Sequence, residues 1–191
     1  SVGFMFGTGG AALVAKTMGE GDQVRANRLF SLIAVAGTAL GIVLAGVGAG
    51  ILGPLLEALG AQGTLKDQGL AYGFMLLAAL PFSIMQNMFQ SFFIAAERPK
   101  VGLAVTIAAG VANIVLDYLF IAVLGWGIAG AALATALGQA LAAVAAVAFF
   151  ASSKTSRLRF ARPTADFRAL GKTCVNGSSE LMTEVAASVV S

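Results

Sequence analysis

The stretch from residue 101 to residue 153 reads VGLAVTIAAGVANIVLDYLFIAVLGWGIAGAALATALGQALAAVAAVAFFASS and contains a single charged residue, Asp117. It is far longer than the roughly 20 apolar residues that one membrane-spanning helix needs. At its middle, Gly125-Trp126-Gly127 combines two turn-forming glycines with an aromatic residue typical of membrane interfaces. We therefore predict two antiparallel membrane helices, at about residues 101–124 and 127–150, joined by this turn.

The composition of the whole chain also indicates a membrane protein. Of its 191 residues, 58% are hydrophobic and 11% are charged, whereas soluble domains carry about 25% charged residues. His is absent and Cys174 is the single cysteine, which excludes an internal disulfide and removes the commonest general base. The chain starts at Ser1 and stops at Ser191 within uncharged runs, so we expect it to be part of a longer protein.

Other charge-free runs predict further membrane helices. We expect complete spans at residues 29–56 and 68–96, a partial span at residues 2–15, and another partial span that begins near Leu170. Together with the two helices above, they predict an all-α integral membrane protein. It would be a polytopic bundle of about four complete transmembrane helices plus two truncated ones. The amphipathic stretch 54–68 is expected to lie along the outer surface.

The positive charges predict the orientation. Of the 12 Lys and Arg residues, all but Lys66 fall in alternate loops, at residues 16–28, 97–100 and 152–172. Cytoplasmic loops are the Lys/Arg-rich ones, so we predict that these three loops face the cytoplasm of a bacterial or archaeal cell, with the chain in its plasma membrane. Loop 16–28 lacks the Gly-Lys-Ser/Thr ending of a phosphate-binding loop, and we interpret it as a turn plus a short interfacial helix.

A stripe of small and polar residues runs along the predicted helix at 101–124. Its members are three or four residues apart and so share one helix face: Gly102, Thr106, Gly110, Asn113 and Asp117. Because a charged side chain in lipid is costly, we expect this face to meet protein or water.

The turn at Trp126 predicts which residues of the second helix lie level with this stripe. Asp117 and Thr135 are each nine residues from Trp126, and Asn113 and Gln139 are each thirteen residues from it. Equal offsets in an antiparallel hairpin mean equal depth, which is about 13 Å below the turn for the first pair. We therefore expect the four side chains to converge in the outer half of the membrane.

Such a cluster suits the binding of an ion. A carboxylate in an apolar surrounding takes up a proton readily, and with amide and hydroxyl oxygens it could instead hold a small hard cation such as Na⁺. Either occupant would neutralise Asp117, which is the elementary step of ion-coupled transport. Asp117, Asn113 and Thr135 are therefore the candidate ion-coupling residues, with no further cofactor. The alternative is a polar network that only joins helices, although such networks are usually uncharged.

Further polar residues lie inside predicted spans. Those of the span at 68–96 share one broad face, for which we favour interhelical hydrogen bonding over substrate contact. Two carboxylates four residues apart lie in the last span, and whether they are functional or interfacial stays open. The full set of candidates for substrate or proton binding is Glu180, Glu184, Gln139, Gln86, Asn87 and Gln90.

The sequence resembles the multidrug and toxic compound extrusion (MATE) family over essentially its whole length. The resemblance is carried by GGAALVAKTMGEGD at residues 9–22, NIVLDYLFI at 113–121, GWGIAGAALAT at 125–135 and SELMTE at 179–184. The most specific part is Asn-x-x-x-Asp with the following Gly-x-x-Gly-Ala-Ala-x-Ala-Thr, because spacing and residue types match together.

The resemblance implies a fold of twelve helices in two six-helix lobes. Residues 1–151 would then belong to the N-terminal lobe, from within its second helix to its sixth. Residues 152–168 would form a cytoplasmic inter-lobe loop, and residues 169–191 would start the C-terminal lobe with a truncated seventh helix. In one branch of the family, the coupling site joins an Asp of the first helix to residues that match the three candidate ion-coupling residues. Glu180 resembles an acidic residue of the seventh helix more loosely.

The resemblance further implies ion-coupled export of cationic or amphipathic drugs by alternating access, in exchange for H⁺ or Na⁺. It implies no enzymatic activity, no nucleic-acid partner, contact with membrane lipid, and a monomer at full length. One alternative is a flippase of lipid-linked oligosaccharides from the same wider superfamily, which a cationic central cavity would favour. A membrane-embedded enzyme and a passive channel are the remaining alternatives, and the lack of His disfavours the enzyme.

Overall fold

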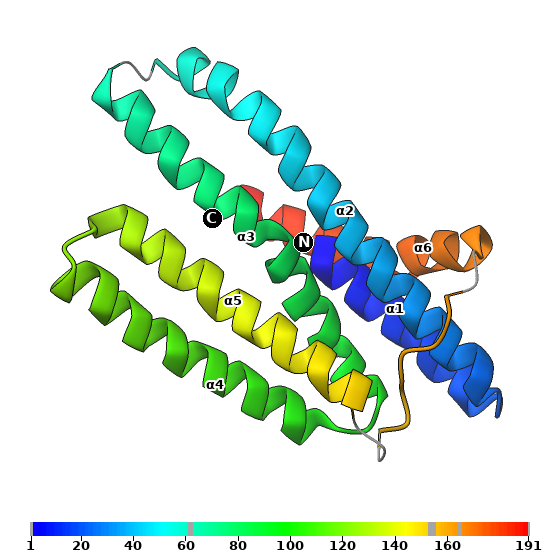
Figure 1. Cartoon of the computed structure of the whole chain (residues 1–191). Helices are drawn as coiled ribbons and strands as arrows, with labels where there is room; N and C mark the ends of the chain where they lie inside the picture. Colours follow the sequence, from blue (N-terminus) through cyan, green and yellow to red (C-terminus); the bar gives the residue numbers. More distant parts are fainter. Residues whose placement is uncertain (1, 61–62, 153–155, 164–165, 191) are drawn as a thin grey trace.

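The computed structural model describes residues 2–60, 63–152, 156–163 and 166–190, and every regular element in this part of the chain is a helix (Figure 1). In chain order the helices are α1 (Val2–Gly19), α2 (Gln23–Ala58), α3 (Thr64–Ala95), α4 (Pro99–Asp117), the π-helix η1 (Tyr118–Val123), α5 (Gly127–Ser152) and α6 (Phe167–Val190). The predicted all-α bundle is confirmed.

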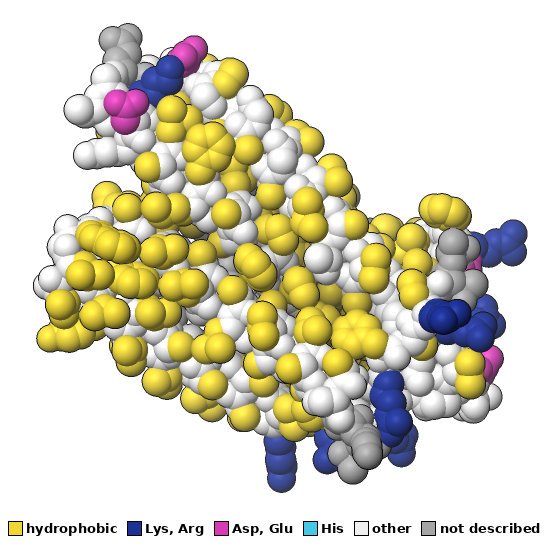
Figure 2. All heavy atoms as spheres, viewed as in Figure 1, with side chains coloured by type: hydrophobic (Ala, Val, Ile, Leu, Met, Phe, Trp, Pro, Cys, Tyr) yellow, Lys and Arg dark blue, Asp and Glu magenta, His cyan; other side chains and the backbone are white. Residues whose placement is uncertain are grey.

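Within the described residues, four helical segments are long and apolar enough to cross a membrane: α2, α3, α4 continued by η1, and α5. They coincide with the four complete spans predicted. Their outer faces carry large apolar side chains that are more than half exposed, such as Ile42, Leu103 and Ile114. Figure 2 shows these hydrophobic side chains across the body of the molecule, while most Lys and Arg side chains gather at one end. Lipid is the expected partner of such a surface.

Two sequence interpretations of loops are wrong. The stretch 54–68 does not lie along the surface, because α2 continues through Pro54 to Ala58 and α3 begins at Thr64. Loop 16–28 contains no separate interfacial helix, because α2 itself begins at Gln23. Asp22 caps this start, since its carboxylate accepts the N–H of Arg25 at 2.9 Å.

The helices form two hairpins, α2–α3 and α4–α5, with α3 packed against α1, α2, α4 and α5 (Figure 1). Helix α6 packs against α1. A mainly apolar cleft of about 940 Å³ lies between the tips of the two hairpins, and its lining includes Leu56, Tyr72, Trp126 and Ile128. The bundle is therefore open between these tips.

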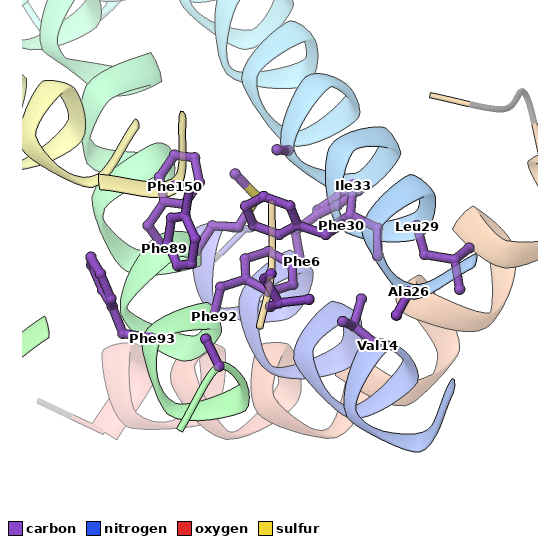
Figure 3. Packing of buried hydrophobic residues seen from close by; sticks show 14 of the residues in the cluster. Phe6, Val14, Ala26, Leu29, Phe30, Ile33, Phe89, Phe92, Phe93 and Phe150 are labelled. Atoms are coloured by element: carbon purple, nitrogen blue, oxygen red, sulfur yellow. The ribbon is translucent and has the colours of Figure 1, made fainter. Parts of the chain in front are cut away.

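Aromatic side chains close the bundle at the opposite end. Phe30 of α2 is fully buried, and its ring lies 4.9 Å from that of Phe92, 4.9 Å from that of Phe150 and 6.1 Å from that of Phe89, measured between centroids (Figure 3). The Phe30–Phe92 pair is edge-to-face, an arrangement that aromatic rings favour. The cluster joins α2, α3 and α5.

The segment of residues 156–161 after α5, which we call the strap, lies along α2. Polar side chains of α2 bind its main chain through three hydrogen bonds: from Gln23 Nε2 to the carbonyl of Arg157, from the N–H of Arg159 to Asn27 Oδ1 (3.1 Å), and from the N–H of Ala161 to Ser31 Oγ (2.8 Å). Leu158 is fully buried, and the Phe160 ring lies 5.0 Å from that of Phe30. The strap is thus held by hydrogen bonds and by packing.

Two glycines enclose the turn between η1 and α5. Gly125 and Gly127 have φ of 68° and 55°, a region that side-chain-bearing residues rarely adopt. Trp126 stacks on Phe120 with ring centroids 5.3 Å apart. The backbone N–H of Trp126 donates to the backbone carbonyl of Phe120 at 2.9 Å. The turn predicted at Gly125-Trp126-Gly127 is confirmed.

Close contacts between α4 and α5 define the register of the hairpin. A Cβ built at Gly138 would lie 3.2 Å from Cβ of Asn113, and one built at Gly130 would lie 2.9 Å from Cβ of Phe120. Asn113 is therefore level with Gly138, one residue from the position expected for Gln139. The register differs from the equal-offset prediction by one residue at Gly138 and by two residues at Gly130.

Helices α1 and α6 approach so closely that their backbones touch. A Cβ added at Gly9 would overlap the carbonyl oxygen of Thr173, and a Cβ added at Gly177 would overlap that of Met5. Glycines at a crossing point allow such contact between membrane helices.

We expect Gly9→Ala and Gly177→Ala to destabilise the protein, because each methyl group meets backbone atoms that cannot rotate away. Overpacking of this kind costs about 1–3 kcal/mol. The measurement is the thermal unfolding midpoint in detergent, with Gly46→Ala as the control, since nothing lies within 4 Å of its added Cβ. Equal midpoints for Gly9→Ala and Gly46→Ala would contradict the close crossing.

A disulfide can check the hairpin register. In a Cys174→Ser background, we expect Asn113→Cys and Gly138→Cys to cross-link on mild oxidation. The two Cβ atoms would lie 3.2 Å apart, so a small outward shift brings them to the roughly 3.8 Å of a disulfide. Gly110→Cys paired with Gly138→Cys is the control, because nothing lies within 4 Å of a Cβ at Gly110. The readout is a mass shift after protease cleavage of the turn. Efficient cross-linking of the control pair would indicate another register.

Candidate functional site

Asp117 lies where the helix changes its geometry. It is the last residue of α4, and the π-helix η1 begins at the next residue, Tyr118. This π-helix continues α4 to Val123, close to the turn at Gly125-Trp126-Gly127. The sequence contained no signal that we recognised for this π-helix.

The carboxylate of Asp117 has a buried oxygen without a partner. Oδ1 is almost completely inaccessible, and it accepts no hydrogen bond from any residue that the structure describes. A charged Asp at the centre of a membrane helix costs about 3 kcal/mol on insertion scales, and leaving the charge unpaired adds to this cost. Such an oxygen is well suited to accept a proton or to coordinate a cation.

Asn113 lies one helical turn before Asp117, on the face of α4 that packs against α5. Its side chain is half-buried and lies beside Gly138. The stripe predicted from the sequence needs one correction, because Gly110 is exposed whereas Ala109 is buried and lies close to Gly138. The protein-facing stripe of α4 thus passes through Ala109, and Gly110 lies at its edge.

Thr135 of α5 has an exposed side chain. Other helical threonines donate their hydroxyl to the carbonyl four residues earlier, namely Thr8, Thr17, Thr38, Thr106, Thr173 and Thr183. Thr135 makes no such bond. No side-chain hydrogen bond joins it to Asn113 or Asp117 in the described part of the chain. The structure thus places Thr135 near the level of Asp117 with its hydroxyl uncommitted, while Gln139 is half-buried one turn away.

The polar residues of α3 divide between two neighbouring helices. Gln90 donates to Thr106 Oγ1 of α4 at 2.9 Å, and Gln86 lines the same narrow crevice. Asn87 faces α1, where a Cβ built at Gly3 would lie 3.1 Å from its Cβ. Interhelical hydrogen bonding, the interpretation we favoured, is confirmed for Gln90.

The remaining candidates belong to α6, which runs through Glu180 and Glu184. Their side chains lie outside the part that the structure describes. Among the described residues, no group of three or more His, Cys, Asp or Glu side chains could hold a metal ion.

Comparison with known proteins places this arrangement in a family. The family model described as MatE matches residues 1–119. The multidrug export protein MepA of Staphylococcus saprophyticus is 26% identical over 166 residues, which cover 85% of this chain and 37% of that protein.

Solved structures show the same fold. The crystal structure of a MATE P26A mutant superposes with a TM-score of 0.91 at 19% identity, covering 98% of this chain and 43% of that one. An inward-facing multidrug resistance MATE family transporter of the MOP superfamily superposes with a TM-score of 0.84 at 20% identity, covering 92% and 40%. The chain thus spans about two fifths of the length of these relatives. Because the family model covers more than half of the residues, we conclude that this chain is a multi-pass membrane protein of the MATE family, which consists of transporters and not of enzymes.

Proposed function

We propose that the chain is part of an ion-coupled multidrug exporter in which Asp117 is the coupling carboxylate. The observation that carries this proposal is the buried, unpartnered Oδ1 of Asp117 in an otherwise uncharged membrane hairpin. A buried charge without a partner is costly, so an ion that binds there is held by the energy of neutralising it. Occupied and empty states would then differ by one charge within the membrane.

Two further oxygens would contact the ion together with the carboxylate of Asp117. Asn113 would contribute its amide oxygen from the preceding turn, and Thr135 its hydroxyl from the facing helix. For Na⁺, both would serve as ligands beside the carboxylate. For H⁺, they would accept or donate hydrogen bonds to the protonated acid. Small rearrangements at the α4–η1 junction would move the carboxylate relative to Thr135.

Ion binding would be coupled to conformational change because the ion neutralises the charge of Asp117. With the ion bound, Asp117 is neutral and the helices around it can change their packing without exposing a charge to lipid. Export would proceed by alternating access, with ion release on one side linked to drug binding or release. The cleft between the hairpin tips is large and mainly apolar, as binding sites for drug-sized amphipathic molecules usually are. It would serve cationic or amphipathic compounds, and Glu180 stays a separate candidate for binding substrate or a proton.

We further propose the organisation that the family relationship implies. Residues 1–151 would belong to the N-terminal lobe, 152–168 to a cytoplasmic inter-lobe loop, and 169–191 to the start of the C-terminal lobe. The end at which Lys and Arg gather (Figure 2) would face the cytoplasm of a bacterial or archaeal cell. The full-length transporter would act as a monomer.

The coupling proposal predicts the effect of Asp117→Asn. In vesicles that contain the full-length protein, we expect ethidium efflux driven by an H⁺ or Na⁺ gradient to fall on the order of tenfold or more, the scale of a typical coupling free energy. The variant keeps the side-chain volume but removes the charge. Asp67→Asn, an exposed carboxylate in the first turn of α3, is the control. Unchanged gradient dependence in Asp117→Asn would sink the proposal.

The role of Thr135 is testable through its hydroxyl. We expect Thr135→Ala to weaken the apparent affinity for the coupling ion by about 5-fold, the effect of losing one favourable contact of roughly 1 kcal/mol. Thr135→Ser should stay close to the unsubstituted protein. The measurement is the ion concentration that gives half-maximal efflux. Equal weakening by Ala and Ser would assign the effect to packing of the lost methyl group.

A further inference from the structure

A basic cavity lies where the end of α1 and the starts of α2 and α6 meet. Its volume is about 240 Å³, and four cationic side chains from these three helices line it: Lys16, Arg25, Arg168 and Lys172. A neighbouring hollow of about 300 Å³ shares Arg25, Leu29 and Asp166 with it and adds Asp22, Val24 and Arg28. Figure 2 shows Lys and Arg side chains gathered at this end of the molecule.

The acidic side chains of the basic cavity do not compensate these charges. Only Glu20 and Asp166 line it. Asp166 caps α6, because its Oδ1 accepts the N–H of Ala169 at 3.0 Å. Among the described residues, the ion pairs lie elsewhere, at Lys66–Glu57 and Arg157–Glu97. Four cations against two carboxylates leave the cavity positive.

Like charges held together need a counter-ion. Because the four cations come from three helices, they can approach one anion from several sides, as Lys and Arg side chains do at phosphate groups. A phosphate group fits the charge and the chemistry of this cavity.

Apolar side chains beside the cavity indicate where the phosphate comes from. Val24, which lines the neighbouring hollow, is 63% exposed, and Phe167, the first residue of α6, is 81% exposed. Exposed apolar residues next to basic ones are expected at the membrane surface, where acyl chains and headgroups meet. Basic pockets between membrane helices on the cytoplasmic side suit anionic lipid headgroups.

We propose that the basic cavity binds the phosphate group of an anionic phospholipid of the cytoplasmic leaflet, and that the bound headgroup holds α6 against α1 and α2. The lipid is then a ligand at a defined site and not only a solvent. This site is separate from the ion site at Asp117, and the proposal does not depend on that site.

The test compares lipids on the purified full-length protein in a neutral detergent. Thermal unfolding is measured with added phosphatidylglycerol, with phosphatidylcholine of the same acyl chains, and with inorganic phosphate. We expect phosphatidylglycerol to raise the unfolding midpoint in a concentration-dependent way, and the other two to have little effect. Ligands that bind only the folded state raise its stability in this manner.

Substitutions test whether phosphatidylglycerol acts at the basic cavity. Replacing both Arg168 and Lys172 by Gln should weaken phosphatidylglycerol about 30-fold, since each such cation contributes on the order of a few-fold in affinity. The control replaces Lys100 and Arg162 by Gln, which removes the same charge from exposed residues outside the cavity. If the cavity variant does not fold, Lys16→Gln at the exposed end of α1 takes its place.

Three outcomes would overturn the proposal. The first is an equal effect of phosphatidylcholine and phosphatidylglycerol on the unsubstituted protein. The second is equal weakening in the cavity variant and the control, which would mean diffuse attraction between surface charges and lipid. The third is full stabilisation by inorganic phosphate, which would assign the cavity to a soluble anion. Selective loss in the cavity variant supports the proposal.

Discussion

The interior of a membrane offers polar groups no water, and this constraint explains most of the structure. Backbone groups are satisfied within helices, as hydrocarbon requires. Several helical threonines follow the same rule, because residues such as Thr38 and Thr106 donate their hydroxyl groups to their own helices. Gln90 is satisfied by a neighbouring helix. By contrast, Oδ1 of Asp117 has no hydrogen-bond partner among the described residues. Burying it costs energy, which a bound ion would offset.

The two ends of the bundle are built differently. At one end, aromatic rings around Phe30 tie α2, α3 and α5 together, and the strap packs against the same ring. At the other end, the hairpins part around a cleft. Asp117 lies between these regions, on the hairpin whose tip borders the cleft. Because the close packing is concentrated at the aromatic end, the hairpin tips beside the cleft can move without unpacking the core.

The spans and the hairpin were predictable because they follow from few rules. Charges are excluded from hydrocarbon, glycines form turns, and antiparallel helices keep a fixed rise, so Asn113 lies within one residue of its predicted level. Features that depend on three-dimensional packing were missed. The π-helix after Asp117, the aromatic cluster and the strap leave no periodic signal in the sequence. The edge position of Gly110 also follows from the crossing of α4 and α5, which spacing along one helix cannot reveal.

The strap has a consequence for how this sequence can change. Three polar side chains of α2 bind its main chain, and main-chain groups are the same whatever residue carries them. Substitutions at Arg159 or Ala161 therefore leave the hydrogen bonds available, with proline as the exception because it lacks the N–H. The strap depends instead on the side chains of Gln23, Asn27 and Ser31, and on the buried Leu158. The conformation of the strap is therefore encoded mainly by side chains of α2 and not by the strap's own sequence.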